Sequence, residues 1–308
     1  MSADTKCQCK SSYGYFPGCS LNANGKAYDE SLRTLYRLLG VKLEELDDWN
    51  CCGATSYMSI DEGSAFLLSA RNLSIAHATG TDDLLAPCSA CYLVLRKTQD
   101  YVEHHPAVAD KVKKSLKNAG LGPLNSVRVR HPLEMLYNDV GLDRFKALAK
   151  RKWRGGRIAC YYGCQAVRPY DEVDQPHNPM RMDELMAAVG APTVDYSLKT
   201  KCCGGSLTGT LHEVGLRLNY ILLKEAARKG AEAIVTICPL CQFNLDVYQK
   251  EIARQSGEKF DMPILYFSQV LGWALGGEQR ELGLQRSLAG QSLIRRWFAA
   301  HEEVEAYV

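Results

Sequence analysis

Residues 232–241, EAIVTICPLC, join a run of apolar and β-branched side chains directly to a C-x-x-C pair. Such a run is typical of a strand buried on both faces of a parallel sheet, and the cysteines then open the helix that follows. The stretch DDLLAPCSAC at residues 82–91 has the same organisation. The sequence therefore predicts two related α/β units, each with a pair of cysteines where a buried strand meets a helix.

Most of the 13 cysteines fall into two sets of five that recur along the chain. Each set contains a single cysteine, then a Cys-Cys-Gly turn, and then a C-x-x-C pair. Corresponding members of the two sets lie 145 to 151 positions apart. The first set is Cys19, Cys51, Cys52, Cys88 and Cys91, and the second is Cys164, Cys202, Cys203, Cys238 and Cys241.

This density of thiol groups is typical of a metal centre. A disulfide framework seldom places adjacent cysteines beside a C-x-x-C pair in both halves of a large chain, whereas a site that needs many soft ligands does. Five thiolates per half exceed the four that tetrahedral zinc takes. We therefore predict an iron–sulfur centre in each half. A zinc-binding scaffold is the alternative, because a C-x-x-C pair alone also fits zinc or a redox dithiol.

The composition agrees with an intracellular chain of two domains. A chain of 308 residues exceeds the usual size of one domain, and 46% of its residues are hydrophobic. The net charge of +2, with both signs interspersed, favours no nucleic-acid partner. We find no signal sequence and no apolar run long enough to span a membrane, so we expect a cytoplasmic protein whose thiols stay reduced.

Alternating strands and helices indicate an α/β fold built from two repeats. Each repeat should hold a mostly parallel sheet flanked by helices, with its cysteines gathered at the carboxyl ends of the strands. We expect the repeats to be domains at residues 13–150 and 151–275, followed by a helical tail at 276–308. Expected strands or extended segments are 13–17, 41–49, 82–88, 157–162, 191–198 and 232–238. Expected helices are 26–40, 61–79, 89–103, 182–190, 211–229 and 239–255.

The residues beside the cysteines fit the same chemistry. Gly53 and Gly204, which follow the cysteine pairs, would let the backbone approach a cluster and donate N–H groups to it. Cys88 and Cys91 lie at a helix start, where the helix dipole favours a thiolate. Outside the sets, we interpret Cys7 and Cys9 as part of a flexible extension without function and Cys160 as a buried core thiol.

Five polar residues are weaker candidates for a role at the centres. A histidine at the start of a helix caps or packs more often than it reacts, and a lysine on a loop is usually solvated. The functional alternative for Lys199 and Lys201, which flank the second cysteine pair, is that they offset the negative charge of a cluster. The candidates are His131, His177, Lys199, Lys201 and His212.

The cysteine spacing and its surroundings resemble the duplicated CCG domain found in the B subunits of heterodisulfide reductases. The similarity runs from about residue 13 to 275. It also extends to iron–sulfur subunits of glycolate oxidase, to lactate utilisation proteins and to some succinate dehydrogenase subunits. Gln165 follows Cys164, whereas members from methanogens often carry a histidine at that position. The chain could therefore also resemble the bacterial members of the family that serve the oxidation of sulfur compounds. The matching segments are YFPGCS (15–20), RHPLEMLYNDVG (130–141), YYGCQAVRP (161–169), HNPMRMDEL (177–185) and KCCGG (201–205).

The resemblance implies a catalytic subunit with two non-cubane 4Fe-4S clusters, each bound by one five-cysteine set. The resemblance also implies that the two repeats are related by a pseudo-twofold axis, and that a disulfide would be reduced or formed in a cavity between them. Electrons would pass through a ferredoxin-like subunit with cubane clusters, itself coupled to a flavoprotein subunit. The chain has no G-x-G-x-x-G fingerprint, so we expect no direct use of NADH. The alternative function is a non-catalytic relay or anchoring subunit of another dehydrogenase complex.

Overall fold

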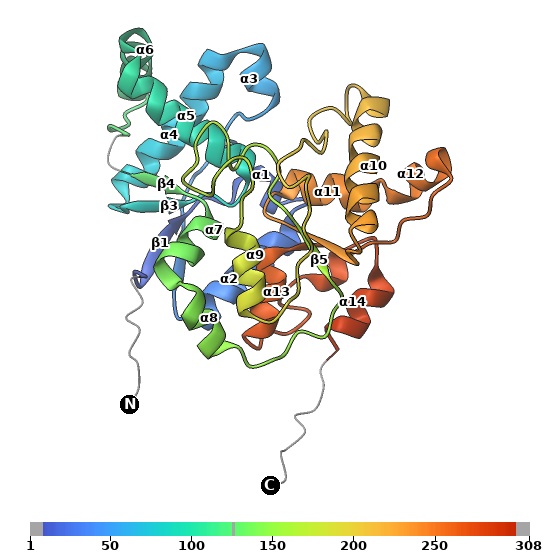
Figure 1. The fold of residues 1–308 in the computed structure, drawn as a ribbon. Helices are drawn as coiled ribbons and strands as arrows, with labels where there is room; N and C mark the ends of the chain where they lie inside the picture. Colours follow the sequence, from blue (N-terminus) through green and yellow to red (C-terminus); the bar gives the residue numbers. More distant parts are fainter. Residues whose placement is uncertain (1–8, 125–126, 300–308) are drawn as a thin grey trace, which may run out of the picture.

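The computed structural model describes residues 9–124 and 127–299, and the chain forms two halves, each built on a small parallel sheet (Figure 1). The first half contains β1 (Ser12–Tyr15), α1 (Gly18–Leu21), α2 (Lys26–Leu39), β2 (Lys42–Glu45), α3 (Ser56–Ile60), α4 (Glu62–Ala78), β3 (Asp83–Leu85), α5 (Ser89–His104), α6 (Pro106–Asn118), β4 (Arg128–Arg130), α7 (Pro132–Met135), a π-helix (Leu136–Val140) and α8 (Leu142–Leu148). The second half contains β5 (Ile158–Tyr161), α9 (Arg181–Ala188), α10 (His212–Arg228), β6 (Ala233–Thr236), α11 (Pro239–Val247), α12 (Gln249–Ser256), β7 (Ile264–Tyr266), α13 (Phe267–Ala274), a 3-10 helix (Leu284–Arg286) and α14 (Gln291–Trp297).

The two sheets have equivalent topologies. In the first, the order is β2-β1-β3-β4 with every pair parallel, and in the second it is β5-β6-β7, also parallel. In the second sheet, a single parallel bridge between Ile158 and Thr193 occupies the position that β2 has in the first sheet. Pro192 precedes that bridge and has no N–H to extend the pairing. The expected α/β class with two parallel sheets is confirmed.

Local sequence accounts for most of the helix boundaries. Gly40 ends α2 in the left-handed conformation with φ 74°, as a helix-terminating glycine should. Asp61 begins α4, where its carboxylate accepts the Ser64 N–H at 3.1 Å. Three features differ from expectation: α3 and α6 are additional helices, and the expected helix at 239–255 is divided at Tyr248 into α11 and α12. The Gln249 side chain bonds both backbone polar groups of Met262, a tertiary contact that accompanies the division.

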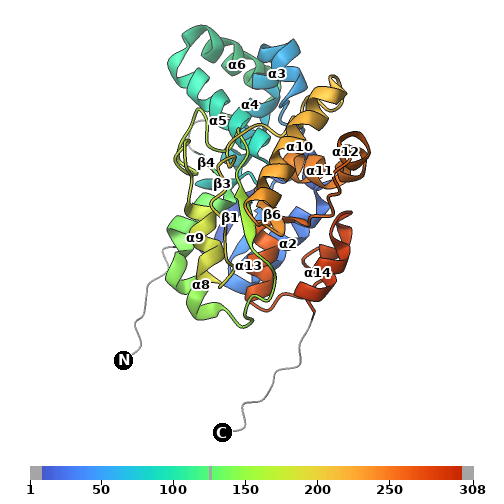
Figure 2. The same ribbon diagram turned by 45° about the vertical axis from the view of Figure 1, so that its right-hand side comes forward.

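The halves share one hydrophobic core. Its buried residues come from both sheets, and α2 of the first half packs against α13 of the second. Figure 2 shows these two helices side by side. At their contact the rings of Tyr28 and Tyr266 stack with centroids 4.3 Å apart, and the hydroxyls of Ser31 and Ser268 lie 2.6 Å apart. A second contact exchanges the roles of the two halves, because α9 of the second half packs against α7 and α8 of the first.

The segment after residue 275 closes over the linker between the halves. Phe298 contacts the rings of Trp153 and Trp273 with centroids 5.5 Å away in each case. Arg286 and Glu281 reach the first half through ion pairs with Glu30 and Arg37 on α2. Through residue 299 this segment holds one 3-10 helix and α14, and residues 300–308 lie outside the described part. In the described part of the chain, each helix is too short or too polar to cross a membrane.

Candidate metal centre

Each cysteine set is assembled at the carboxyl ends of the strands of one sheet. Cys19 lies in α1, shortly after β1, and Cys88 precedes α5 directly after β3. Cys164 and Cys238 occupy the equivalent places after β5 and β6. Parallel strands bring these loops to one edge of each sheet, so residues far apart in sequence become neighbours.

The sulfur atoms of each set meet in pairs. In the first set, the Sγ atoms of Cys19 and Cys51 are 3.8 Å apart, and those of Cys52 and Cys91 are 3.2 Å apart. In the second set, Cys203 and Cys241 approach to 3.4 Å. Cys164 and Cys202 are hydrogen-bond partners there too. The structure therefore gathers the members of each set on its own half.

Each set has a buried floor and an accessible rim. The C-x-x-C cysteines and the second cysteine of each adjacent pair are buried, none more than 5% exposed. Cys19, Cys51 and Cys202 are exposed, and Cys164 is partly exposed. A group bound by all five sulfurs would be anchored from within and reachable from outside.

Glycines that our sequence reasoning did not assign allow the sulfurs to converge. Gly18 has φ 68°, and a Cβ there would lie 2.9 Å from the Cys91 sulfur. Gly163 has φ 71°, and its Cβ would lie 3.1 Å from the Cys241 sulfur. A side chain at Gly18 would force the sulfur to shift and one at Gly163 would press on it, and the positive φ strains any other residue at both positions. The signal was present in the sequence, because a glycine precedes the lone cysteine of both sets.

Gly53 and Gly204 also allow close packing of each Cys-Cys-Gly turn on a helix. Both adopt positive φ, and a Cβ would meet the backbone of the helix behind, at 3.0 Å from Ala65 Cα and 2.9 Å from Gly215 Cα. Their absent side chains let each turn pack on α4 or α10. Their N–H groups point to sulfur, and Gly204 N lies 3.2 Å from Cys202 Sγ. The expected donation of N–H to sulfur remains a property of this turn.

Hydrogen bonds between neighbouring sulfurs raise the pKa of one cysteine and lower the pKa of its partner, as in Cys19 with Cys51 and Cys164 with Cys202. Hydrogen bonding from Cys164 lowers the pKa of Cys202 to about 6, and hydrogen bonding from Cys241 lowers the pKa of Cys238 to about 7. In the first set, hydrogen bonds from Cys19 and Cys52 lower the pKa of Cys51. One thiolate is thus available in each set at neutral pH, and thiolate is the form that binds soft metals.

These features fit a sulfur-ligated iron cluster better than a single ion. The donors are all soft sulfur, five per set, and backbone N–H groups point to sulfur at both Cys-Cys-Gly turns. Within the described ranges, no three His, Cys, Asp or Glu side chains have the arrangement that would hold a single metal ion. The ten cysteines of the two sets are the residues that would hold the clusters.

His131 has a structural position rather than a reactive one. The residue is fully buried, its Nδ1 accepts the Leu133 N–H at 3.1 Å, and its Nε2 lies 3.0 Å from the Pro87 carbonyl oxygen. Burial lowers its pKa to about 4. The imidazole is therefore neutral at physiological pH and caps α7, which corresponds to the capping interpretation.

The remaining polar candidates lie in different environments. Lys199 corrects our expectation of a solvated lysine, because it is 4% exposed and its ammonium group pairs with Asp183. Lys201 and His177 are exposed. His212 bridges α10 and α12 through its 2.9 Å contact with the Glu251 carboxylate. The structure thus brings none of these four side chains into the sulfur pairs of the two sets.

The cysteines outside the two sets agree only in part with our interpretation of the sequence. Cys160 is fully buried in β5, as a core thiol should be. Cys9 is partly buried and packs against the hydrophobic core, so the described end of the N-terminal extension is not a free tail. Cys7 lies outside the described residues.

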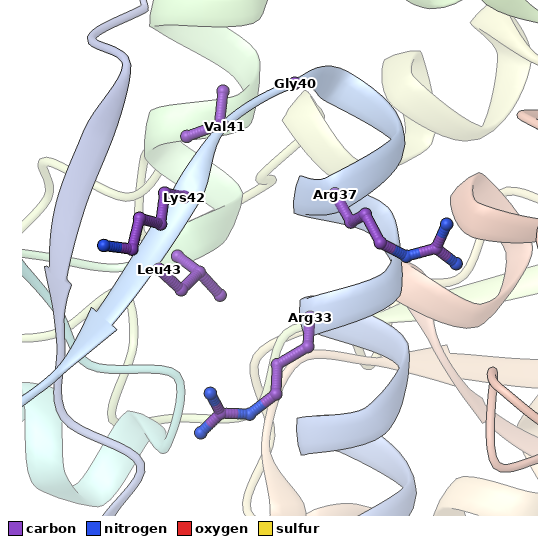
Figure 3. Close-up of a pocket in the computed structure, with 6 residues that line it drawn as sticks. All are labelled: Arg33, Arg37, Gly40, Val41, Lys42 and Leu43. Atoms are coloured by element: carbon purple, nitrogen blue, oxygen red, sulfur yellow. The ribbon is translucent and has the colours of Figure 1, made fainter.

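An open hollow of about 410 Å³ between α2 and β2 does not belong to either cysteine set (Figure 3). Three basic residues line it, and all are engaged within the protein. The ion pairs join Arg33 to Asp29 and Glu45, Arg37 to Glu281, and Lys42 to Glu44. The lining of the hollow therefore offers no uncompensated cation for a ligand.

Fold and site together define a duplicated α/β protein whose two halves each gather five cysteines at a sheet edge. The sequence profile of the cysteine-rich CCG domain matches residues 13–96 and again residues 158–246. The chain belongs to this family of cysteine-rich domains, and both copies are present.

Curated relatives span nearly the whole chain. A protein of Archaeoglobus profundus that is named as similar to the heterodisulfide reductase B subunit is 30% identical over 86% of this chain and 90% of its own length. The B subunit of a ferredoxin/F(420)H(2)-dependent CoB-CoM heterodisulfide reductase from Methanosarcina acetivorans is 28% identical over 88% of this chain and 92% of its own length. The membrane anchor subunit of an 8-methylmenaquinol:fumarate reductase from Wolinella succinogenes is 28% identical over 90% of this chain and 96% of its own length. The resemblance to heterodisulfide reductase B subunits is confirmed.

Among solved structures, a hypothetical protein from Helicobacter pylori has the same fold. It superposes with a TM-score of 0.71 at 14% sequence identity and covers 91% of this chain. This chain spans about half of that structure, 52% of its length. At this identity the likeness concerns the fold alone.

Proposed function

We propose that this chain is the cluster-bearing catalytic subunit of an oxidoreductase complex, and that it reduces or forms a disulfide at two non-cubane 4Fe-4S clusters. The observation that carries the proposal is the duplication of the site. Two equivalent five-sulfur sets lie on two halves that share one core, and each set has an accessible rim. One such set would suffice for a simple electron carrier.

The two sets are neighbours across the contact between the halves. The hydroxyl of Ser89, the residue after Cys88 in the first half, faces the Cys238 sulfur of the second half. The rings of Tyr28 and Tyr266 stack across this contact, and burial together with charge on Cys88 or Cys238 raises the pKa of both phenols. A single disulfide placed between the halves would have one set on each side.

This arrangement suits the electron count of disulfide chemistry. Reduction of one S–S bond takes two electrons and two protons and releases two thiols, and the reverse reaction returns them. Bound clusters would supply or take these electrons one at a time, one cluster per half. The chain itself holds the clusters, places the two halves on either side of the bond and shields the inner cysteines from water.

A partner would deliver the electrons. The relatives from Methanosarcina are named as ferredoxin-dependent reductase subunits, and we propose a cubane-cluster subunit and a flavoprotein subunit as partners here. Exposed apolar side chains follow both Cys-Cys-Gly turns: Tyr57 and Ile60 on α3, and Leu211 and Val214 around the start of α10. These helices lie at the same end of the molecule, where a partner would cover the exposed cysteines (Figure 1).

A second function has its own support. The relative from Wolinella succinogenes is named as the membrane anchor subunit of a fumarate reductase, and it matches this chain over 278 residues. In that role the chain would carry electrons or tether a dehydrogenase, and a disulfide would not be its substrate. The two functions differ in one measurable respect, which is whether a disulfide oxidises the reduced protein.

The test uses anaerobically purified protein with its iron and sulfide contents determined. The protein is reduced with dithionite-reduced methyl viologen, a one-electron donor, and mixed with small symmetric and mixed disulfides. The catalytic function predicts two thiols released for each disulfide and for every two electrons consumed. A relay predicts reoxidation by an acceptor dye but no thiol release. NADH in place of viologen should give no turnover with the isolated chain.

Cys203→Ser supplies the matched control. It should remove the second cluster and leave the first, so a reaction that requires both halves would stop while dye reduction continued at a lower level. Thiol release that persisted unchanged in this variant would contradict a two-cluster mechanism.

A further inference from the structure

Two buried hydroxyl groups at the boundary between the cysteine sets have no hydrogen-bond partner of ordinary geometry among the described residues. They are the phenol of Tyr28, whose residue is 0% exposed, and the hydroxyl of Ser89, whose residue is 1% exposed. Leaving a buried hydroxyl unsatisfied destabilises the folded state. Such groups are rare in folded proteins and call for an explanation at each position.

Both hydroxyls lie where the two sets come together. Ser89 follows Cys88 of the first set, and its hydroxyl faces Cys238 of the second. Tyr28 lies on α2, where burial raises the pKa of its phenol, and negative charge on Cys238 or Cys88 would raise it further. The helix turn before it is close to the second set as well, because a Cβ on Gly25 would lie 2.9 Å from the Pro239 side chain.

Packing does not require the Tyr28 hydroxyl. The Tyr28 ring stacks on Tyr266 with an interplanar angle of 2°, and phenylalanine would make the same stack. The Tyr266 hydroxyl is satisfied, since it donates to Gln242 at 3.3 Å. Tyr36, two turns further along α2, also has a partner, the Met135 sulfur at 3.4 Å. Of these three tyrosines in the described core, Tyr28 is the one whose phenol lacks an acceptor.

We propose that the hydroxyls of Tyr28 and Ser89 donate hydrogen bonds to electron-rich sulfur at the boundary between the two cysteine sets. The inference rests on the proposed function, because that sulfur belongs either to a cluster with its cysteine ligands or to a thiol substrate bound between the halves. The two residues are positioning residues. They hold sulfur in place and stabilise negative charge on it, and neither takes part in electron transfer.

A hydrogen bond to sulfur has a definite electrostatic consequence. Reduction adds negative charge to a cluster, and a donated N–H or O–H bond stabilises that charge and raises the reduction potential. For a substrate thiolate, the same bond strengthens binding instead. The two sources of sulfur therefore separate experimentally, since the first acts without substrate and the second acts only in its presence.

The test compares Tyr28→Phe and Ser89→Ala with Tyr36→Phe as the matched control. Tyr36→Phe makes the same change on the same helix at a buried position, where the phenol contacts the Met135 sulfur. Iron content, the midpoint potential by spectroscopic titration, and the affinity for 2-mercaptoethanol as a probe thiol are measured on each loaded protein. Thermal unfolding is measured on loaded and iron-free protein.

If the hydroxyls donate to sulfur of a cluster, the midpoint potentials of Tyr28→Phe and Ser89→Ala should be more negative than that of the wild type. Their iron content should not change, and the midpoint potential of Tyr36→Phe should equal that of the wild type. If the hydroxyls donate instead to sulfur of a bound thiol, the midpoint potentials should not change. Binding of the probe thiol should weaken about tenfold, because roughly one hydrogen bond is lost. In either case iron-free Tyr28→Phe should be no less stable than the iron-free wild type.

Unchanged potential, thiol affinity and iron content in both variants would overturn the inference and leave the proposed function intact. Failure of the wild-type protein to bind iron would contradict both this inference and the proposed function. Reduced stability of the iron-free Tyr28→Phe protein would show that the hydroxyl serves the fold, which contradicts the proposal as well.

Discussion

The ammonium group of Lys199 lies 2.8 Å from the carboxylate of Asp183, and both side chains are 5% exposed. Lys199 also donates to the Pro179 carbonyl at 3.0 Å, and its own carbonyl accepts the N–H groups of Tyr162 and Gly163. One residue thus joins the segment before the second cysteine pair to the turn that carries Cys164. A buried ion pair of this kind is costly to break from one side.

Replacing Lys199 should therefore destabilise the second half. Lys199→Met leaves the Asp183 carboxylate buried without its cation, and we expect the free energy of unfolding to fall by about 3–5 kcal/mol. Urea denaturation at neutral pH measures the loss. Lys201→Met is the control, because Lys201 is exposed and its replacement should change stability by less than about 0.5 kcal/mol. Equal effects of the two changes would show that the buried pair does not stabilise the fold.

Alanine at Gly18 or Gly163 should displace a cysteine sulfur. In each variant the new Cβ would occupy the space next to Cys91 or Cys241, so we expect loss of iron from the corresponding half, measured by metal analysis. Gly40→Ala and Gly190→Ala are matched controls, since both positions have positive φ but nothing within 4 Å of the added carbon. They should cost about 1–2 kcal/mol of stability and retain their iron. Full loading of Gly163→Ala would contradict the assigned role.

Iron and acid-labile sulfide should reach about eight each per chain if both sets bind a four-iron cluster. Cys203→Ser or Cys238→Ser should reduce both values to about four, because serine replaces a soft thiolate with a hard oxygen. Cys160→Ala and Cys7→Ser alter cysteines outside the sets and should leave the iron content unchanged. Zinc without iron in the anaerobic wild-type protein would exclude the clusters.

Stability should fall in mild acid because of His131. Its pKa in the folded protein is about 4, below the ordinary value of 6.5. As the pH falls from 6.5 towards 4, the unfolded chain takes up a proton that the folded chain does not, so folding weakens by up to about 3 kcal/mol. His131→Asn preserves a helix-capping acceptor but does not titrate. The difference in unfolding free energy between wild type and variant should therefore narrow or reverse from pH 7 to 5. A constant difference would mean that His131 titrates normally.

Several elements were predictable because their causes are local. The run from Ala233 to Thr236 is apolar and β-branched, and it forms a buried strand of a parallel sheet as expected. Gly40 ends α2 because glycine alone adopts positive φ without strain. The division after Tyr248 and the loss of a strand at residues 191–198 were not predicted, since they depend on tertiary contacts and on the edge position of the segment.

The sequence by itself determined the repeat, the order of strands and helices, and the ten cysteines of the two sets, because spacing and hydrophobic period are properties of the chain. Only the tertiary structure decided that Lys199 is buried and that the halves share one core through α2 and α13. It also decided that Tyr28 and Ser89 reach the boundary between the sets. The physical reason is that burial and pairing depend on which surfaces meet, and residues more than 200 positions apart, such as Tyr28 and Tyr266, meet only after both sheets have packed.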